Sequence, residues 1–198
     1  MFPSTRSGTR TFSEFMFLVH EDAKADLIDG AIYIDPPENL GHNQLKTWFA
    51  VVLGVYMRRR RLGHLTLGRV AYRLGERDAP EPDVAVVRAE RLEILRRGYV
   101  DGAPDLAIEI ISPDSVHRDY DLKRGQYERA GVQEYWIIDQ DEKQALFLVR
   151  GPEGFVEAAP KDHVYSSSVV PGFHLDVRWL WQDPLPDELT ILQSLLAS

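Results

Sequence analysis

The sequence predicts an α/β domain with a central mixed β-sheet, flanked by helices and extended by further antiparallel strands. Short apolar strands alternate with helical segments along the chain. The segment 105–139 reads as strand, helix and strand, the order of a right-handed parallel crossover. The 198 residues suffice for one domain with a substantial core, and no repeat or linker divides them. We therefore expect a flexible N-terminal arm over residues 1–12 and a single domain over residues 13–198.

Apolar periodicity and turn residues place the elements of the first half. The pair Asp29-Gly30 is typical of a hairpin turn. In chain order the predicted elements are a short helix over 13–23 with Ser13 as N-cap, a hairpin over 26–37, a helix over 41–62 that Gly63 ends, strands at 64–74 and 82–89, and a short helix over 89–98.

The second half begins with the crossover and ends in short strands. A strand at 105–111, a helix over about 119–130 closed by Gly131 and a strand at 134–139 form the crossover. Antiparallel strands at 145–151, 154–160 and 166–176 follow, and residues 186–196 read as a terminal helix.

The composition excludes several classes of function. The chain has no cysteine, which rules out disulfides, thiolate zinc sites and cysteine nucleophiles. It contains no P-loop and no dinucleotide-binding glycine motif. The formal net charge is −8, so any role in binding nucleic acid depends on a local patch. No apolar run has the length of a signal-peptide core or a membrane span, and we expect a cytoplasmic protein that does not enter a membrane.

Glu109 requires an explanation, because it lies in the middle of an apolar strand. Alternation places Ala107 and Ile111 on its own face. Strands of this kind are usually covered on both faces, and an unpaired ionised carboxylate there costs several kcal/mol. Glu109 must therefore be protonated, ion-paired or bound to a metal. Pairing with an arginine and a position at the exposed end of the strand are structural alternatives.

A second carboxylate precedes the neighbouring apolar strand. Asp83 follows Pro82 and stands directly before a run of Val and Ala. If the two strands are neighbours in one sheet, Asp83 and Glu109 converge at its edge. Together with a backbone carbonyl such as that of Ile110, they would form half of an octahedral site for Mg²⁺ or Mn²⁺. The alternative for Asp83 is a turn or strand-capping aspartate.

Lys123 lies on the helix that follows Glu109 and shares a face with Asp119 and Tyr127 by i, i+4 spacing. A crossover helix packs against the sheet, so this amine is expected to point back toward the strand. A lysine there can orient a metal-bound water or stabilise charge on a phosphorus centre. The alternative is a solvated charge that pairs with Asp119.

Five segments resemble, in order and spacing, the Uma2 family of the PD-(D/E)XK restriction-endonuclease-like superfamily: "DLIDG", "PDVAVV", "APDLAIEIISPDS", "DLKRGQYERAGVQEYWIID" and "PGFHLD". The resemblance runs from about Phe15 to Leu180 and is most specific over 104–139. It implies a restriction-endonuclease-like fold and Mg²⁺-dependent hydrolysis of phosphodiester bonds, with DNA as the substrate. It also implies that Asp83 is the motif aspartate and Glu109 the second acid.

Two departures from the family pattern affect the expected site. The superfamily motif has a lysine two positions after the second acid, where this chain has Ile111. The resemblance makes Lys123 the replacement, as a lysine that has migrated to the helix. In "DLIDG", Asp26 stands where relatives are expected to have a glutamate, and as an acid it can assist the metal through a water. A surface charge at a strand end is the alternative for Asp26.

His42 opens the long helix in "GHNQL". The resemblance implies a contact between this histidine and a phosphate or the metal-bound water, and a helix N-terminus favours an anion. A local hydrogen bond at the helix start is the alternative. The arginines at 58–61 and 96–97 are the local compensation for the acidic charge. Four successive residues spread around a helix, so we interpret 58–61 as a solvated helix end.

The sequence supports a metal-dependent nuclease as the main hypothesis. Asp83 and Glu109 would hold Mg²⁺ or Mn²⁺, Lys123 would position the water, and Asp26 and His42 would assist. The alternative is a nuclease fold that binds or self-associates without cutting, which the acidic charge and the missing motif lysine favour. A homodimer is expected, with the late strands and the apolar tail as its interface. The alternative is that these segments only close the core.

Overall fold

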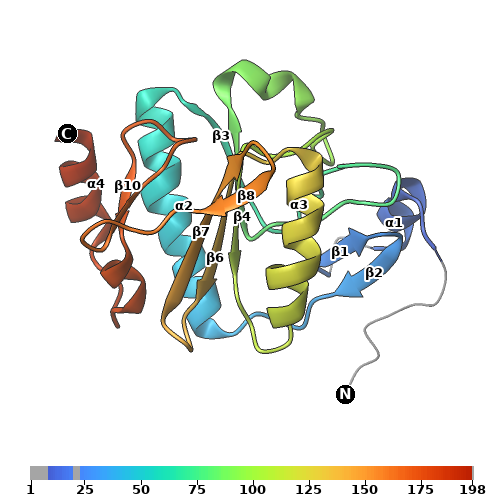
Figure 1. The fold of residues 1–198 in the computed structure, drawn as a ribbon, viewed down its shortest axis with the longest axis horizontal. Coiled ribbons are helices and arrows are strands. Elements are labelled where there is room, and N and C mark those ends of the chain that lie inside the picture. Colours follow the sequence, from blue (N-terminus) through green and yellow to red (C-terminus); the bar gives the residue numbers. More distant parts are fainter. Residues whose placement is uncertain (1–8, 20–22, 198) are drawn as a thin grey trace.

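The computed structural model describes residues 9–19 and 23–197, which fold around one mixed six-stranded sheet (Figure 1). The strand order is β3–β4–β5–β6–β7–β8, and only β5 and β6 pair in parallel. The strands are β3 Gly63–Leu67, β4 Val84–Arg88, β5 Leu106–Ile110, β6 Glu134–Asp139, β7 Gln144–Gly151 and β8 Gly154–Glu157. The predicted mixed α/β sheet is confirmed.

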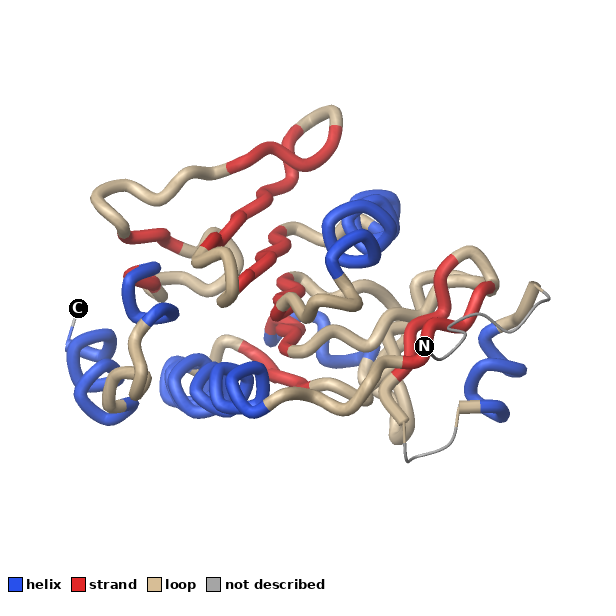
Figure 2. Tube along the Cα trace, turned by 90° about the horizontal axis from the view of Figure 1, so that it is seen from below, coloured by secondary structure: helices blue, strands red, loops and turns tan. Residues whose placement is uncertain are grey.

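Helices cover both faces of this sheet (Figure 2). On one face, the apolar residues of α2 (Leu40–Arg60) share a core with Ile108 and Trp136. On the other face, Tyr127 of α3 (Arg124–Ala130) packs with Ala107 and Tyr135. All five residues of β5 are consequently buried, as its apolar sequence predicts.

The crossover between β5 and β6 is interrupted by a π-helical segment. The chain runs from β5 through the π-helix Arg118–Lys123 into α3, which ends at Gly131 with φ 85°. The sequence predicted one regular helix over this stretch. A π-turn is rare and is found frequently at functional sites. Here it carries Asp119 and Lys123, whose side chains are both buried.

The β1–β2 hairpin lies beside the sheet and has the predicted turn. Strands β1 (Ala25–Ile28) and β2 (Ala31–Ile34) pair antiparallel, and Asp29 and Gly30 both have positive φ, as a tight hairpin turn requires. The remaining elements are α1 Phe12–Leu18, the 3₁₀ helices η1 Ala89–Ile94 and η3 Val177–Trp181, β9 Val164–Ser166, β10 His174–Asp176 and α4 Glu188–Ala197.

Several predicted boundaries were wrong. The N-cap of α1 is Thr11 rather than Ser13, because Thr11 and Glu14 form a capping box. Helix α2 ends at Arg60, and its C-cap Arg61 adopts the left-handed conformation ahead of Gly63. The predicted strand at 64–74 ends at Leu67, and the stretch 166–176 contributes parts of two strands joined by a turn.

Most of the predicted N-terminal arm, residues 1–8, lies outside the described residues. In the part that is described, the Arg10 N–H donates to the Gly30 carbonyl at 2.8 Å and the Phe12 N–H to the Glu76 carbonyl at 2.7 Å. Within residues 9–19 and 23–197, no helix has both the length and the apolar character needed to cross a membrane.

Candidate active site

The candidate site lies where the β1–β2 hairpin, the start of α2 and the adjoining ends of β4 and β5 meet. Val84 pairs with Ile108 in the antiparallel register, so Asp83 and Glu109 are the next residues opposite one another. Directly opposed residues of an antiparallel pair present their side chains to the same face. Each of the two acids is 1% exposed. The sequence-predicted convergence of these two positions is therefore present in the fold.

Asp83 is held by contacts to both carboxylate oxygens. Oδ1 lies 2.6 Å from Lys24 Nζ and 3.1 Å from His42 Nε2. Oδ2 accepts a hydrogen bond of 2.8 Å from the Ile110 N–H. Burial alone would raise the pKa of Asp83, but the Lys24 ammonium and His42 outweigh burial and hold that pKa well below its usual value. Asp83 is consequently an ionised carboxylate at neutral pH. The observed contact of Ile110 with Asp83 is through its backbone N–H. A metal contact through the Ile110 carbonyl stays a prediction.

Glu109 contacts a lysine and a tyrosine. Its Oε1 lies 3.0 Å from Lys123 Nζ and accepts a 2.8 Å hydrogen bond from the Tyr127 hydroxyl. Burial outweighs the attraction of Lys123 and raises the pKa of Glu109 to about 8. This answers why a carboxylate is tolerated inside the sheet. It is hydrogen-bonded, it adjoins a cation, and at neutral pH it favours the protonated form.

Lys123 is enclosed by three carboxylates and is 1% exposed. Besides Glu109, its Nζ lies 3.0 Å from Asp26 Oδ2 and 3.3 Å from Asp119 Oδ1. Burial alone would lower the pKa of Lys123, but these acids raise it well above its usual value. The interpretation of Lys123 as a solvated surface charge was wrong, and the expectation that it points back to the strand is confirmed.

Asp26 is fully buried on β1, so its interpretation as a surface charge at a strand end was wrong. Its Oδ2 lies 3.3 Å from Arg118 Nε and close to Lys123, while its Oδ1 accepts from the Glu81 N–H at 2.8 Å. Burial would raise the pKa of Asp26, but Lys123 and Arg118 outweigh burial and lower it. Arg118 also pairs with Asp35, which lies 3.3 Å from Lys24.

These ion pairs connect the acids into one network with an excess of negative charge. With histidine counted as neutral and every carboxylate ionised, five carboxylates and three cations leave a net charge of −2. The carboxylates are Asp26, Asp35, Asp83, Glu109 and Asp119, and the cations are Lys24, Arg118 and Lys123. A buried excess of this kind is unfavourable unless a proton or another cation joins the network.

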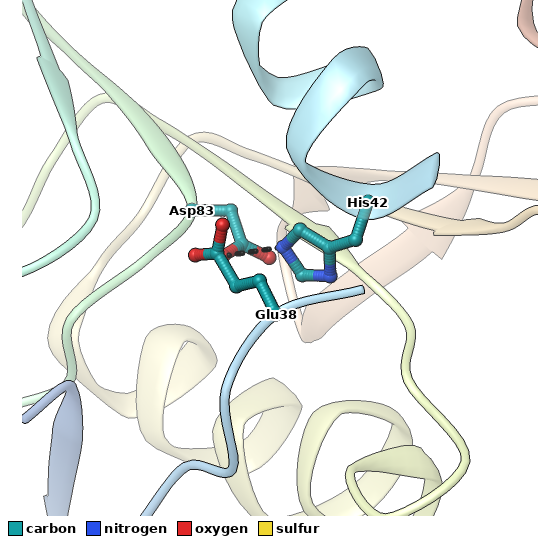
Figure 3. A group of neighbouring side chains, drawn as sticks. All are labelled: Glu38, His42 and Asp83. Atoms are coloured by element: carbon teal, nitrogen blue, oxygen red, sulfur yellow. Dashed lines mark ion pairs between the residues drawn. The ribbon is translucent and has the colours of Figure 1, made fainter. Parts of the chain in front are cut away.

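Asp83, His42 and Glu38 form a group able to hold a metal ion, since one ligand atom from each lies within 4.8 Å of the others (Figure 3). His42 comes from the first turn of α2, where its N–H donates to the Asn39 side chain at 2.8 Å. Glu38 precedes that helix and pairs with Lys46. His42 therefore meets Asp83 directly, rather than making only a local bond at the helix start.

The site opens to solvent through a cavity of about 220 Å³. Its lining includes Lys24, Asp35, Glu38, His42 and Ser112, whereas Asp83, Glu109 and Lys123 do not line it. Four residues of the site were not predicted from the sequence: Lys24, Asp35, Glu38 and Arg118. For Glu38 a signal was present, because it stands four positions before His42. Lys24 and Asp35 flank the β1–β2 hairpin, and Arg118 lies in the π-helix. No sequence pattern around these three residues predicts that they belong to the site.

The arginines at 58–61 lie at the other end of α2, and all four are exposed. A helix rises about 1.5 Å per residue, which separates Arg59 from His42 by about 25 Å along the axis. The interpretation of this run as a solvated helix end is confirmed, and it contributes no charge to the site.

Comparisons with known proteins agree with this fold. A solved structure from Anabaena variabilis ATCC 29413, described as a putative nuclease belonging to DUF820, is 23% identical and has a TM-score of 0.72. The match covers 86% of this chain and 97% of that one, and at this identity it shows the fold alone. A search of curated proteins finds no match. The model of the Uma2 family, described as "Putative restriction endonuclease", matches residues 12–178. Since that match spans most of the sequence, this chain belongs to the Uma2 family.

Proposed function

We propose that this protein is a nuclease that hydrolyses phosphodiester bonds in DNA and depends on Mg²⁺ or Mn²⁺. The observation that carries the proposal is the buried ion-pair network, in which five carboxylates share three cations, next to a solvent-accessible cavity. One divalent cation would balance the excess of two carboxylates once Glu109 has released its proton. The family description as a restriction endonuclease supports nucleic acid as the substrate.

The donor atoms of the site suit such a cation. Asp83 and Glu38 offer carboxylate oxygens and His42 an imidazole nitrogen, all within 4.8 Å. Carboxylates suit Mg²⁺ and Mn²⁺, and an imidazole shifts the preference toward Mn²⁺. The pairing of Asp83 with Glu109 across β4 and β5 supports Glu109 as a further ligand once it loses its proton. A bound cation of this kind lowers the pKa of a water and neutralises charge on a phosphate.

The two lysines are suited to different tasks. Lys24 lines the cavity and lies 2.6 Å from Asp83, so its ammonium is placed to contact a phosphate oxygen or orient the attacking water. Lys123 does not line the cavity. Its contacts support a role in setting the position and charge of Glu109 and Asp26. Lys24 thus supplies an amine where the motif lysine is replaced by Ile111.

The test is cleavage of a DNA plasmid and of single-stranded DNA by wild type, Asp83→Asn and the exposed control Glu153→Gln. Asparagine keeps an oxygen that accepts from the Ile110 N–H while the charge is lost, and circular dichroism checks that the variant is folded. Wild type and Glu153→Gln should cleave with Mn²⁺ or Mg²⁺ and stop with EDTA. Asp83→Asn should lose about 100-fold or more in rate. Cleavage that survives EDTA, or equal rates for Asp83→Asn and wild type, would overturn the proposal.

A second candidate is a nuclease fold that binds without cutting. The contacts of Glu109 Oε1 with Lys123 and Tyr127 favour it, because they occupy that oxygen with protein partners. Calorimetry with Mn²⁺ separates the candidates, since absence of binding at millimolar metal supports the second one. The expected homodimer is tested separately, by measuring the mass in solution.

A further inference from the structure

A second and larger cavity, of about 640 Å³, adjoins the candidate active site. It lies between the first turns of α2, the turn after β6 and the segment after η3. Asn39 and His42 line both this cavity and the smaller one that leads to Lys24. The two cavities are therefore neighbours that share part of their lining. Small-ligand pockets typically have volumes of roughly 300–1,000 Å³.

The lining of the larger cavity is rich in side-chain amides. Asn43 and Gln44 come from α2, Gln140 from the turn after β6 and Gln182 from the end of η3. The amides of Gln44, Gln140 and Gln182 make no hydrogen bond to any residue among 9–19 and 23–197. A Cβ built on Gly41 would lie 3.5 Å from Gln140 Oε1, so this amide extends over the start of α2. Donors and acceptors from three separate segments thus converge on one space.

An aromatic surface completes the lining. Trp181 is half-buried, packs against the main core and also lines the cavity. Indole faces stack on nucleobases, and Asn and Gln amides match the paired donors and acceptors on base edges.

The charge of the lining excludes the phosphate part of a nucleotide. Asp141, Asp183 and Glu188 line the cavity against one cation, Lys143. A phosphate would be repelled here, whereas a neutral heterocycle with exocyclic amino groups gains hydrogen-bond acceptors. The larger cavity therefore suits the base of a nucleotide, and the phosphate would lie at the adjoining smaller cavity.

We propose that this cavity binds one unpaired nucleobase of a DNA strand whose phosphate lies at the Lys24–His42 site. The inference rests on the proposed function for the position of that phosphate. In a duplex the base edges are already paired and stacked, so a base enters only from a single strand or after flipping out. We therefore expect this protein to bind unpaired DNA in preference to duplex DNA.

The test measures binding of short fluorescein-labelled DNA by anisotropy, in EDTA to prevent metal-dependent cleavage. Two single strands of equal length are compared, one with its bases and one abasic, so that their phosphates contribute equally. The variants are Gln140→Ala/Gln182→Ala and Trp181→Leu. Gln144→Ala/Gln193→Ala is the matched control, since both of those glutamines are exposed and outside the cavity.

Wild type and the control should bind the base-bearing strand about tenfold more tightly than the abasic strand, and both cavity variants should lose that preference. Equal affinity of wild type for the two strands would overturn the inference, as would an unchanged preference in Gln140→Ala/Gln182→Ala. Cleavage is measured separately with Mn²⁺. A preference for the base-bearing strand without cleavage would refute the nuclease proposal but support base binding in the cavity. Cleavage without that preference would support the nuclease proposal and refute base binding in the cavity.

Discussion

Lys24 Nζ lies 2.6 Å from Asp83 Oδ1, the same oxygen that faces His42 Nε2 at 3.1 Å. An ammonium and an imidazole thus share the carboxylate oxygen that we propose as a metal ligand. Like charges repel strongly at this spacing when they are shielded from water. Lys24 should therefore oppose metal binding while it provides positive charge beside the phosphate.

Substitution of Lys24 by methionine should separate these two effects. Mn²⁺ affinity should rise about tenfold or more, because roughly 1.4 kcal/mol of repulsion is enough for that change. The rate of DNA cleavage should fall, because the cavity loses its amine. Calorimetry and a cleavage assay measure the two effects, with the exposed Lys161→Met as control. An unchanged or weaker Mn²⁺ affinity in Lys24→Met would show that the metal does not bind at Asp83.

Lys123 should be required for stability. In Lys123→Met, Asp26, Glu109 and Asp119 lose the ammonium that they share, and they remain buried. Removal of one partner from a buried ion pair costs about 3–5 kcal/mol. Urea unfolding should show a loss of this size for Lys123→Met and a change within about 0.5 kcal/mol for Lys161→Met. Equal stability of the two variants would contradict the packing of Lys123 among these acids.

The contact between Glu109 and Lys123 could be anticipated from sequence because Glu109 lies in a strand and Lys123 in the helical crossover that packs against it. The apolar run around Glu109 predicts a buried strand, and i, i+4 spacing places Lys123 on one face with Asp119 and Tyr127. In the structure Lys123 contacts both Glu109 and Asp119, and Tyr127 donates a hydrogen bond to Glu109. The assignment of roles to these residues remains a prediction.

The cations on the other acids could not be anticipated, because they depend on tertiary placement. Lys24 precedes β1 and reaches Asp83 only because the β1–β2 hairpin packs beside β4. Arg118 reaches Asp26 and Asp35 through the π-helical turn, which no periodicity reveals. Among the acids, Glu38 lies in a proline-rich loop before α2, and its only sequence signal is its position four residues before His42.

The exposed arginines at the end of α2 should have no part in catalysis. Arg58→Gln/Arg59→Gln removes two positive charges that lie about 25 Å from His42. At 0.15 M ionic strength, charges beyond about 8 Å are largely screened, so the cleavage rate should change less than twofold. Lys24→Met under the same conditions provides the positive control. A large loss of cleavage in the arginine variant would indicate that DNA extends along α2.

Glu109 should make the stability of the protein fall as the pH rises. Burial raises its folded-state pKa from 4.5 to about 8, ahead of the opposing effect of Lys123. Between pH 4.5 and 8 the folded chain keeps this proton while the unfolded chain releases it. The contribution of Glu109 is therefore fully present below pH 4.5 and is lost as the pH approaches 8, by up to about 1.4 kcal/mol for each pH unit.

Glu109→Gln isolates this contribution, because glutamine is uncharged at every pH and is close to glutamate in size. Urea unfolding of wild type, Glu109→Gln and Glu153→Gln at pH 5, 6.5 and 8 provides the measurement. The difference in unfolding free energy between wild type and Glu109→Gln should shift steadily in favour of glutamine as the pH rises, while Glu153→Gln runs parallel to wild type. A constant difference across this range would mean that Glu109 is ionised throughout, with Lys123 compensating its burial completely. Titrating groups outside this ion-pair network cancel in the comparison, since they are common to both proteins.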